Sequence, residues 1–362
     1  MCIIVNMMQV QHLRGATGQG ALVVLCGGVS AEHDVSLASA RSVITAIADR
    51  CHVRPIVIDR EGRALSERDS RERLGLSAVD GAAGGPPRPL TALALAPDEV
   101  VFPLLHGPFG EDGSVQGWLR LMGATYVGSG VHASAVGMDK LSMKAVLAAH
   151  GLAQVAYRGV RWSDHRSDPD ATLATLDTLG YPLFVKPANL GSSLGIHRVD
   201  DDAELRDALD DAFRFDRRLI VEAAVEGVRE LEVAVLGNET PRSSPVGEIR
   251  YTSAFYDYEA KYTPGSAELL IPAALDADLA ERARAMALRA FQAIDAAGLA
   301  RVDLFLDERT GTLYLNEINT MPGFTATSMY PRLWAAAGID YPDLIAMLVA
   351  LARERRDGGS GG

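Results

Sequence analysis

Short apolar runs alternate with helical patterns along the first third of the chain. Three runs have the length and composition of buried strands: "ALVVLCGG" at 21–28, "VRPIVID" at 53–59 and "VVFPLLHG" at 100–107. The spacing of apolar positions predicts helices from about Asp34 to Ala48 and near Ser114. Strands that alternate with helices indicate a parallel α/β sheet, which binds its ligands at the carboxyl ends of its strands.

The rest of the chain contains two further units in which strands and helices are mixed. A helix at 138–151 opens the first unit, and the strands "YPLFVKP" and "RLIVEAAV" flank a helix at 201–213. The second unit contains the strand "LEVAVLG", a long helix at about 276–296, a hairpin and a final helix. The stretch at 80–97, rich in Gly, Pro and Ala, predicts a surface loop. We therefore expect four segments: an α/β domain at 1–139, a central unit at 140–228, a C-terminal unit at 229–357 and a disordered tail at 358–362.

The hairpin places polar residues inside otherwise apolar strands. Its sequence is "RVDLFLDERTGTLYLNEINTMPGF", residues 301–324. A three-residue loop that ends at Gly311 suits a type I turn followed by a left-handed glycine. The resulting register pairs Glu308 with Thr312, Asp303 with Glu317 and Arg301 with Asn319, with Phe305 and Leu315 on the same face.

Two facing carboxylates repel each other unless a positive charge lies between them. Asp303, Glu317 and the amide of Asn319 offer oxygen ligands, which suit a Mg²⁺ ion that keeps water molecules and bridges to phosphate. The alternative is a solvated charged face in which Arg301 is the counter-ion. The hairpin alone does not decide between the two interpretations.

Lysine occurs at only four positions: Lys140, Lys144, Lys186 and Lys261. An ammonium is a compact point charge and a guanidinium a wide fork, so the two are not equivalent in a tight phosphate site. Lys186 closes a strand before "ANLGSSLG", whose glycines would let backbone N–H groups approach a phosphate. The order differs from G-x-x-x-x-G-K-[ST], in which lysine follows the loop. Alternatively, the scarcity of lysine is due to chance, and the glycine-rich loop is an ordinary β-turn that binds no phosphate.

Three polar segments follow predicted strands or interrupt the pattern. Glu32 enters the helix after the first strand and suits an ammonium group, although a carboxylate there also favours the helix dipole. His106 ends the third strand near the same point, although a single histidine is more often structural. The segment "FYDYEAKYTPG", which contains Lys261 and Tyr262, is typical of a lid over an active site, with an inert surface loop as the alternative.

The composition narrows the class of protein and its location. A net charge of −12 disfavours nucleic acid and anionic membranes as partners. No stretch approaches the roughly 20 apolar residues of a membrane span. Cys2, Cys26 and Cys51 form no C-x-x-C pair, which suggests reduced thiols, with Cys26 a small core residue. The N-terminal residues lack the features of a signal peptide, so we expect a cytoplasmic protein.

Six segments in order, spread over about 20–352, resemble the D-alanine–D-alanine ligases of the ATP-grasp superfamily. They are "GGVSAEHDVS", "LHGPFGEDGSVQG", "GSGVHASAVGMDK", "VKPANLGSSLG", "FYDYEAKY" and "NEINTMPGFT". The resemblance implies the ATP-grasp fold, in which an N-terminal parallel α/β domain is followed by two α+β subdomains that clasp ATP. It also implies an ADP-forming acid–amino-acid ligase that makes D-alanyl-D-alanine for peptidoglycan through a D-alanyl phosphate.

The resemblance also implies roles for individual residues. ATP is the implied co-substrate. The residues implied at its phosphates are Lys140, Lys186, Ser193 and Lys261. Glu222 and the backbone of Val225 are implied at the adenine, and Glu230 at the ribose. Those implied as ligands of two Mg²⁺ ions, with Mn²⁺ as an alternative, are Asp303, Glu317 and Asn319. The implied catalytic group comprises Glu32, Ser192 and Tyr262, which fix the first D-alanine and close the lid, and Arg301 and the Gly323 N–H, which form an oxyanion hole. The residues implied at the substrates are Glu32, His106 and Ser328.

Some points stay open at this level. The base that takes the proton of the second D-alanine is either His106 or the Tyr262–Ser192 pair. A ligase that joins D-alanine to D-lactate or another acceptor is the nearest rival, and Tyr262 disfavours it because lactate-using relatives generally replace this tyrosine. A catalytically silent nucleotide-binding protein on the same fold is the second rival. The resemblance implies a homodimer with small-molecule substrates only.

Overall fold

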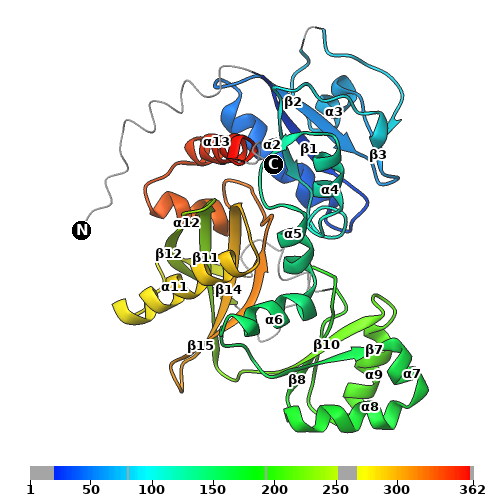
Figure 1. The fold of residues 1–362 in the computed structure, drawn as a ribbon, viewed down its shortest axis with the longest axis vertical. Helices are drawn as coiled ribbons and strands as arrows, with labels where there is room; N and C mark the ends of the chain where they lie inside the picture. The colour runs from blue at the N-terminus through cyan, green and yellow to red at the C-terminus, as the bar shows by residue number, and fades with distance from the viewer. Residues whose placement is uncertain (1–19, 80, 192–193, 252–266, 359–362) are drawn as a thin grey trace.

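The structure, a computed structural model, describes residues 20–79, 81–191, 194–251 and 267–358. These residues form three β-sheets of six, four and five strands. In Figure 1 the six-stranded sheet lies at the top and the four-stranded sheet at the bottom, with the five-stranded sheet between them. Helix α13, the last in the chain, returns to the first sheet.

The first sheet has the strand order β4-β3-β2-β1-β5-β6, and β2, β1, β5 and β6 are parallel. The prediction of a parallel α/β sheet is therefore confirmed for these four strands. Antiparallel β3 and β4 extend one edge, so the predicted loop at 80–97 supplies an edge strand. The elements are β1 (Leu22–Gly27), α2 (His33–Ile47), β2 (Val53–Ile58), β3 (Arg63–Ala64), α3 (Glu67–Arg73), β4 (Arg88–Pro89), η1 (Leu90–Ala92), β5 (Val100–Leu104), α4 (Ser114–Leu121) and β6 (Thr125–Tyr126).

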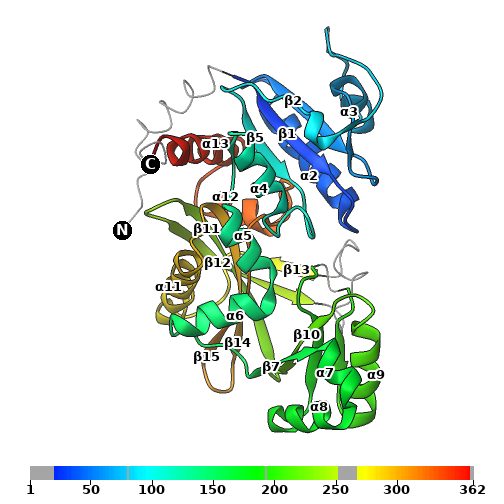
Figure 2. The same cartoon turned by 45° about the vertical axis from the view of Figure 1, so that its right-hand side comes forward.

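Two helices, α5 (Val131–Met138) and α6 (Lys140–Ala149), lead from the first sheet to the second. Figure 2 shows both helices beside the five-stranded sheet, where α5 contacts β15 (Thr312–Asn319) and α6 contacts α11 (Ala277–Ala293). The single helix predicted at 138–151 corresponds to α6, which Asp139 caps by accepting from the Ser142 N–H.

The second sheet is antiparallel, with the order β7-β10-β8-β9. One face packs on helices through a core that includes Val185, Leu209 and Val221. The elements are β7 (Tyr157–Arg161), α7 (Trp162–Ser167), α8 (Pro169–Leu176), η2 (Asp177–Leu179), β8 (Leu183–Pro187), β9 (His197–Val199), α9 (Asp202–Ala212) and β10 (Arg218–Ala223). The predicted helix and strands are present, and β7, β9, α7, α8 and η2 are additional.

The third sheet is also antiparallel, with the order β13-β12-β11-β14-β15. Helix α11 covers one face through a core that includes Val233, Phe291 and Val302. The elements are β11 (Val228–Gly237), β12 (Arg242–Tyr251), β13 (Ala267–Leu270), α11 (Ala277–Ala293), β14 (Gly298–Asp307), β15 (Thr312–Asn319), α12 (Met329–Ala336) and α13 (Tyr341–Gly358). The predicted final helix is thus a pair of helices.

The predicted register of the hairpin is right at its open end and wrong at its turn. Arg301 pairs with Asn319 and Asp303 with Glu317, as predicted. Nearer the turn, however, Asp307 and not Glu308 pairs with Thr312, so the loop is one residue longer than predicted. The pairs near the turn are Leu304 with Leu315, Phe305 with Tyr314, Leu306 with Leu313 and Asp307 with Thr312.

A β-bulge at Asn316 restores the register. Leu313, Leu315 and Ile318 are all buried in the core under α11, although their spacing changes from two residues to three. One extra residue between Leu315 and Ile318 is therefore needed to keep all three on the same face. This bulge also moves Leu315 to the core face, so the prediction that it shares the polar face with Phe305 is wrong.

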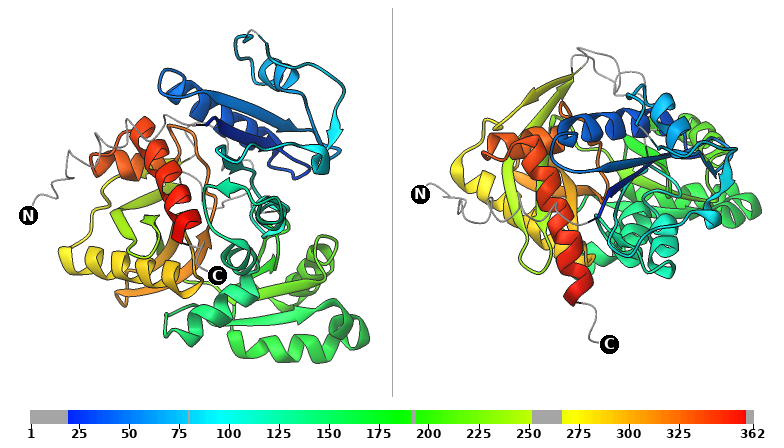
Figure 3. Two further views of the ribbon diagram at one scale, coloured as in Figure 1. Left: turned by 45° about the horizontal axis from the view of Figure 1, so that its top comes forward. Right: turned by 90° about the horizontal axis from the view of Figure 1, so that it is seen from above.

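The first sheet and the last two helices share one hydrophobic core. Its members include Phe102 from β5, Val43 from α2, and Phe324, Trp334 and Leu348 from the C-terminal part of the chain. Figure 3 shows α13 beside the strands of the first sheet. No single helix in the described ranges is long and apolar enough to cross a membrane; α12 and α13 meet that test only together, across a bend of 102°.

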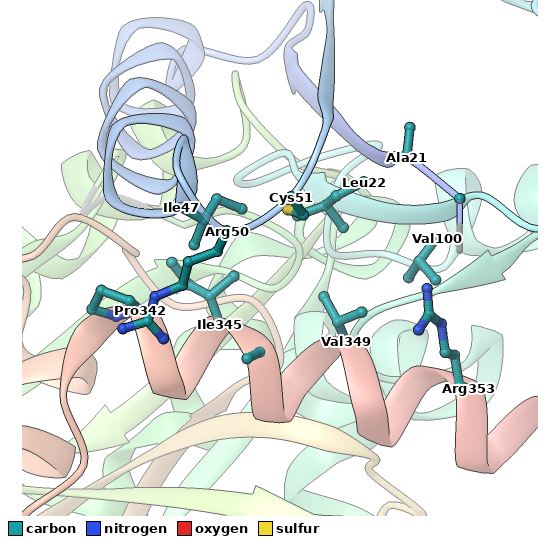
Figure 4. A pocket seen from close by; sticks show the side chains of 12 residues that line it. Ala21, Leu22, Ile47, Arg50, Cys51, Val100, Pro342, Ile345, Val349 and Arg353 are labelled. Carbon is teal, nitrogen blue, oxygen red and sulfur yellow. The ribbon is translucent and has the colours of Figure 1, made fainter. Parts of the chain in front are cut away.

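Cys26 is buried in β1, as predicted for a small core residue, and burial raises the pKa of its thiol. Cys26 and Cys51 are both free thiols, while Cys2 lies outside the described residues. Cys51 lines the apolar pocket of Figure 4, together with Leu22, Val100 and Ile345. This pocket lies at the amino ends of β1 and β5, opposite the end where a parallel sheet binds its ligands.

Candidate active site

Glu32 lies where the first sheet meets the glycine-rich loop. It immediately precedes α2, at the carboxyl end of β1, as the sequence predicted. A Cβ built on Gly107 would lie 2.5 Å from Glu32 Oε2, and one built on Gly191 would lie 3.4 Å from the same atom. Gly107 also has a φ of 73°, which favours glycine. The Glu32 carboxylate therefore lies between the loop after β5 and the loop after β8.

Arg301 holds together the polar patch on the five-stranded sheet. Its guanidinium donates to the two carboxylate oxygens of Asp303 at 2.7 and 2.6 Å and forms an ion pair with Glu232 at 3.1 Å. The Asn319 amide donates to Asp303 at 3.0 Å. Asp303 pairs with Glu232 on one side and with Glu317 on the other, so three carboxylates stand in a row on β11, β14 and β15.

The oxygens of this patch fit a hard divalent cation. A carboxylate has about four lone-pair sites, so Asp303 can accept from Arg301 and still bind a metal. Within the described residues, no three His, Cys, Asp or Glu side chains are grouped so as to hold a metal. A cation bound by Asp303, Glu317 and Asn319 would therefore keep water molecules or bind phosphate oxygens, which is the habit of Mg²⁺.

Glu222 brings two lysines together on the four-stranded sheet. Lys186 Nζ lies 2.6 Å from Glu222 Oε2, and Lys144 Nζ lies 2.7 Å from Oε1. Burial alone would raise the pKa of Glu222, but the two lysines lower it to about 2, so the carboxylate is ionised. Lys140 Nζ donates to the carbonyl oxygen of Leu190 at 2.6 Å, which fixes the start of the glycine-rich loop.

Two more residues of the expected ATP site lie next along the chain. Val225 is half-buried in the connection between β10 and β11. Glu230, on β11, accepts a hydrogen bond from the Tyr251 hydroxyl at 3.2 Å. Burial raises the pKa of Glu230, and the nearby Asp303 carboxylate acts in the same direction. The connection joins the second and third sheets, so a ligand at both residues would lie where these sheets meet.

His106 is buried, and protein groups engage both of its ring nitrogens. Nδ1 lies 3.0 Å from the carbonyl oxygen of Met321, and Nε2 lies 3.1 Å from Ser39 Oγ. Because a carbonyl can only accept, Nδ1 carries the hydrogen and Nε2 accepts from Ser39. Burial lowers the pKa of His106, so the ring is neutral. Ser39 Oγ in turn accepts from the Phe324 N–H at 3.4 Å. His106 therefore ties α2 to the loop that contains Gly323.

Gly323 and Ser328 lie together before α12. A Cβ built on Gly323 would lie 3.5 Å from Ser328 Oγ. Ser328 precedes the first residue of α12, and its hydroxyl contacts Thr325 Oγ1 at 2.7 Å. The amino end of a helix attracts a carboxylate, which agrees with the role that the resemblance implies for Ser328. Ser192, Ser193, Lys261 and Tyr262 lie outside the described residues.

Glu111 and Glu232 belong to this region and were missed in the sequence. Glu111 Oε1 accepts from the Gly107 N–H at 2.8 Å and lies 3.9 Å from His106 Nδ1. The signal for Glu232 was its two-residue spacing from Glu230 in one strand, which puts both on the same face. The signal for Glu111 was its position in the polar "GPFGEDG" segment next to His106.

We expect Glu111→Gln to remove a pH dependence of stability. Burial, and then the nearby Glu32 carboxylate, raise the pKa of Glu111 from 4.5 to about 8. Between these values the unfolded chain releases the Glu111 proton and the folded protein keeps it, so stability falls as pH rises. Thermal unfolding between pH 5 and pH 8.5 should show a smaller decline for Glu111→Gln than for wild type. The same change at the exposed Glu226 is the control, and an unaltered decline in Glu111→Gln would refute this assignment.

Comparison with known proteins agrees with this arrangement. Family models described as "D-ala D-ala ligase N-terminus" and "D-ala D-ala ligase C-terminus" match residues 21–129 and 146–350. The D-alanine–D-alanine ligase of Deinococcus radiodurans is 52% identical over 339 residues, which cover 92% of this chain and 99% of that protein.

Two solved structures share the fold over nearly the whole chain. The D-alanine–D-alanine ligase from Coxiella burnetii superposes with a TM-score of 0.78 at 33% identity, covering 94% of this chain and 96% of that one. The VanG D-Ala:D-Ser ligase from Enterococcus faecalis gives 0.76 at 29% identity, covering 92% and 99%. The fold and the gathered lysines and carboxylates thus define an ATP-grasp protein, as predicted. The chain belongs to the D-alanine–D-alanine ligase family, which confirms the resemblance.

Proposed function

We propose that the protein joins two D-alanine molecules to D-alanyl-D-alanine and converts ATP to ADP and phosphate. The observation that carries this proposal is the polar patch of Arg301, Asp303 and Glu317 on one sheet face, in a chain 52% identical to a named ligase. The carboxylate oxygen of the first D-alanine attacks the γ-phosphorus, and ADP leaves. The amine of the second D-alanine then attacks the acyl phosphate, and phosphate leaves.

Nucleotide binding in this proposal uses residues of the second and third sheets and of the connection between them, one residue of α6, and two residues outside the described ranges. Lys140, Lys186, Lys261 and Ser193 contact the phosphates, where positive charges offset the repulsion between the triphosphate and an attacking carboxylate. Glu222 and the backbone of Val225 contact the adenine, and Glu230 contacts the ribose. To bind a phosphate, Lys186 Nζ must move away from Glu222, which it contacts at 2.6 Å.

Asp303, Glu317 and Asn319 would hold Mg²⁺ in this proposal, with Mn²⁺ as an alternative. The bound ions would supply charge neutralisation on the β- and γ-phosphates. Arg301 orients the carboxylate of Asp303 through the bidentate contact and keeps one edge of the patch positive.

The second half of the reaction depends on the loop at 321–328. Arg301 and the Gly323 N–H stabilise the oxyanion that forms when the amine attacks the carbonyl carbon. Ser328 and the amino end of α12 bind the carboxylate of the second D-alanine. Glu32, with Ser192 and Tyr262, fixes the ammonium of the first D-alanine and excludes water from the acyl phosphate.

His106 acts as a positioning residue in this proposal. Its Nε2 accepts from the Ser39 hydroxyl, which in turn accepts from the Phe324 N–H, and its Nδ1 donates to the Met321 carbonyl oxygen. Both nitrogens therefore help to hold the loop at 321–328 in place. This arrangement favours the Tyr262–Ser192 pair over His106 as the group that takes the ammonium proton. The loop position, and with it the Gly323 N–H, depends on the His106 contacts.

The biological setting is also part of the proposal. A ligase of this kind supplies D-alanyl-D-alanine to peptidoglycan synthesis in the cytoplasm, as a homodimer. We propose domains at 1–139, 140–228 and 229–357, with 358–362 as a tail. The three sheets follow the first three ranges in order, but β11 begins at Val228 and α13 ends at Gly358, so both of these boundaries differ from the elements by one residue.

A product assay tests the function. With ATP, Mg²⁺ and D-alanine alone, we expect ADP release and D-alanyl-D-alanine in equal amounts. With D-alanine plus D-lactate or D-serine, the dipeptide should remain the main product at neutral pH. D-serine is included because of the structural similarity to a D-Ala:D-Ser ligase. A mixed product in excess would establish the rival specificity, and no ADP release with any acceptor would indicate a silent nucleotide-binding protein.

A further inference from the structure

Lys144 is a buried charge to which the proposed reaction gives no role. It is one of only four lysines, and only 1% of its surface is exposed. A buried ammonium is costly unless it is paired, and the partner of Lys144 is Glu222 at 2.7 Å. An explanation of Lys144 must therefore involve Glu222.

Glu222 lies between two lysine–aromatic pairs. In the four-stranded sheet it pairs with Tyr157 on one neighbouring strand and with Phe184 on the other. Lys144 Nζ lies 5.4 Å from the centre of the Tyr157 ring, and Lys186 Nζ lies 5.6 Å from that of Phe184. Each carboxylate oxygen of Glu222 thus faces one lysine, and each lysine also faces one ring.

The two lysines differ in what they are free to do. Lys186 lies on β8 directly before the glycine-rich loop, and 12% of its side chain is exposed. Lys144 lies on the inner side of α6 and its side chain is enclosed. If Lys186 turns to a phosphate, Lys144 remains as the lysine in direct contact with Glu222, while Lys140 acts on it only from a distance. Without Lys144, Glu222 would either retain Lys186 or take up a proton.

The protonation state of Glu222 decides which base it can bind. An ionised carboxylate only accepts hydrogen bonds, and it therefore suits the 6-amino group of adenine. A protonated carboxyl also donates, and it can bind the 6-oxo group of hypoxanthine or guanine.

We propose that Lys144 is a positioning residue for nucleotide selection, which holds Glu222 as an acceptor for the 6-amino group while Lys186 binds phosphate. This inference rests on the proposed contact of Glu222 with adenine. It assigns no contact with ATP to Lys144 itself, whose effect passes through Glu222.

The test compares ATP with inosine triphosphate, which carries a 6-oxo group in place of the 6-amino group. The ratio of kcat/KM for ATP to that for inosine triphosphate should fall about tenfold in Lys144→Met, the effect of one hydrogen bond to a charged group. The loss should lie mainly in KM for ATP. Lys144→Arg, which keeps a buried charge, should retain most of the selectivity. Met143→Leu, a volume-conserving change at a buried position of the same helix, controls for packing and should leave the ratio unchanged.

Glu222→Gln separates this inference from the function on which it rests. Its amide can donate to a 6-oxo group, so the ratio should fall in this variant as well. If Glu222→Gln changes the ratio and Lys144→Met does not, the role of Lys144 is wrong while the adenine contact stands. If Glu222→Gln leaves the ratio unchanged, both are wrong.

A double variant keeps the test decisive if Lys144→Met alone does not fold. Removing both members of a buried ion pair is better tolerated than removing one. Adding Lys144→Met to Glu222→Gln should leave the ratio as it is in Glu222→Gln, since Lys144 acts through Glu222. A further fall in the double variant would show an independent role and would overturn the proposal.

Discussion

The Arg301→Lys variant is expected to lose about 100- to 1000-fold in kcat while it remains folded. Lysine keeps the positive charge beside Asp303 and Glu232, so these carboxylates are not left unpaired. It cannot reproduce the planar fork that holds both oxygens of Asp303 and also points a donor at an oxyanion. Steady-state ADP release and thermal unfolding, measured on the same preparation, give the two quantities.

Arg229→Lys is the matched control for this variant. Arg229 makes a bidentate contact with Glu248 at 3.1 and 2.6 Å on the opposite face of the same sheet. The exposed fractions of the Arg229 and Arg301 side chains are 17% and 16%. Both variants should therefore lose similar stability, and only Arg301→Lys should lose turnover. Wild-type kcat in Arg301→Lys, or an equal loss in Arg229→Lys, would remove Arg301 from the chemistry.

Glu317→Gln should reduce kcat by about 100-fold, equivalent to about 2.7 kcal/mol, and should weaken the dependence on Mg²⁺. The amide is a poorer ligand for a hard cation than a carboxylate. It also removes one of the negative charges opposite Asp303, so the fold should not suffer. Turnover measured against Mg²⁺ concentration tests this, because a lost ligand raises the concentration needed for half-maximal rate.

The control for Glu317→Gln lies at the other end of the same hairpin. Glu308 is exposed at the turn and pairs only weakly with Arg229, at 3.2 Å. Glu308→Gln should leave both the rate and the Mg²⁺ dependence unchanged. An unaltered Mg²⁺ curve in Glu317→Gln would show that the patch does not bind the metal through this residue.

The hairpin shows which features of a strand pair can be predicted from a sequence pattern and which cannot. The polar pairs at its open end were predictable because alternation fixes which residues share a face. The turn was not, because three- and four-residue loops both accommodate Gly311, whose φ of 67° fits either. The longer loop and the bulge shift the register by one residue in opposite directions, so the pairing of Asp303 with Glu317 was predicted correctly although both features were missed. The bulge could be inferred from the spacing of Leu313, Leu315 and Ile318 only if all three were known to lie in one core, which the structure shows.

The candidate site was predictable by motif and not by geometry. Glu32, Lys186 and Glu317 belong to segments with a recognisable order, so their involvement could be inferred from the resemblance. Their positions relative to one another depend on how separate sheets meet, which no local pattern encodes. For the same reason Glu111 was missed, and Lys144 was singled out as one of four lysines but given no role. Glu111 becomes informative only when its burial beside Glu32 is known, and Lys144 only when its burial against Glu222 is known.

The shared core of the first sheet and the last helices has a consequence during synthesis. Strands β1 and β5 leave the ribosome early, but Trp334 and Leu348, which complete their core, leave it more than 200 residues later. Until then the apolar side of the first sheet stays exposed to other nascent chains. A truncation that removes α13 should therefore yield an aggregating product and not a stable N-terminal domain. Chaperone occupancy should persist on the nascent chain until its last helix has emerged.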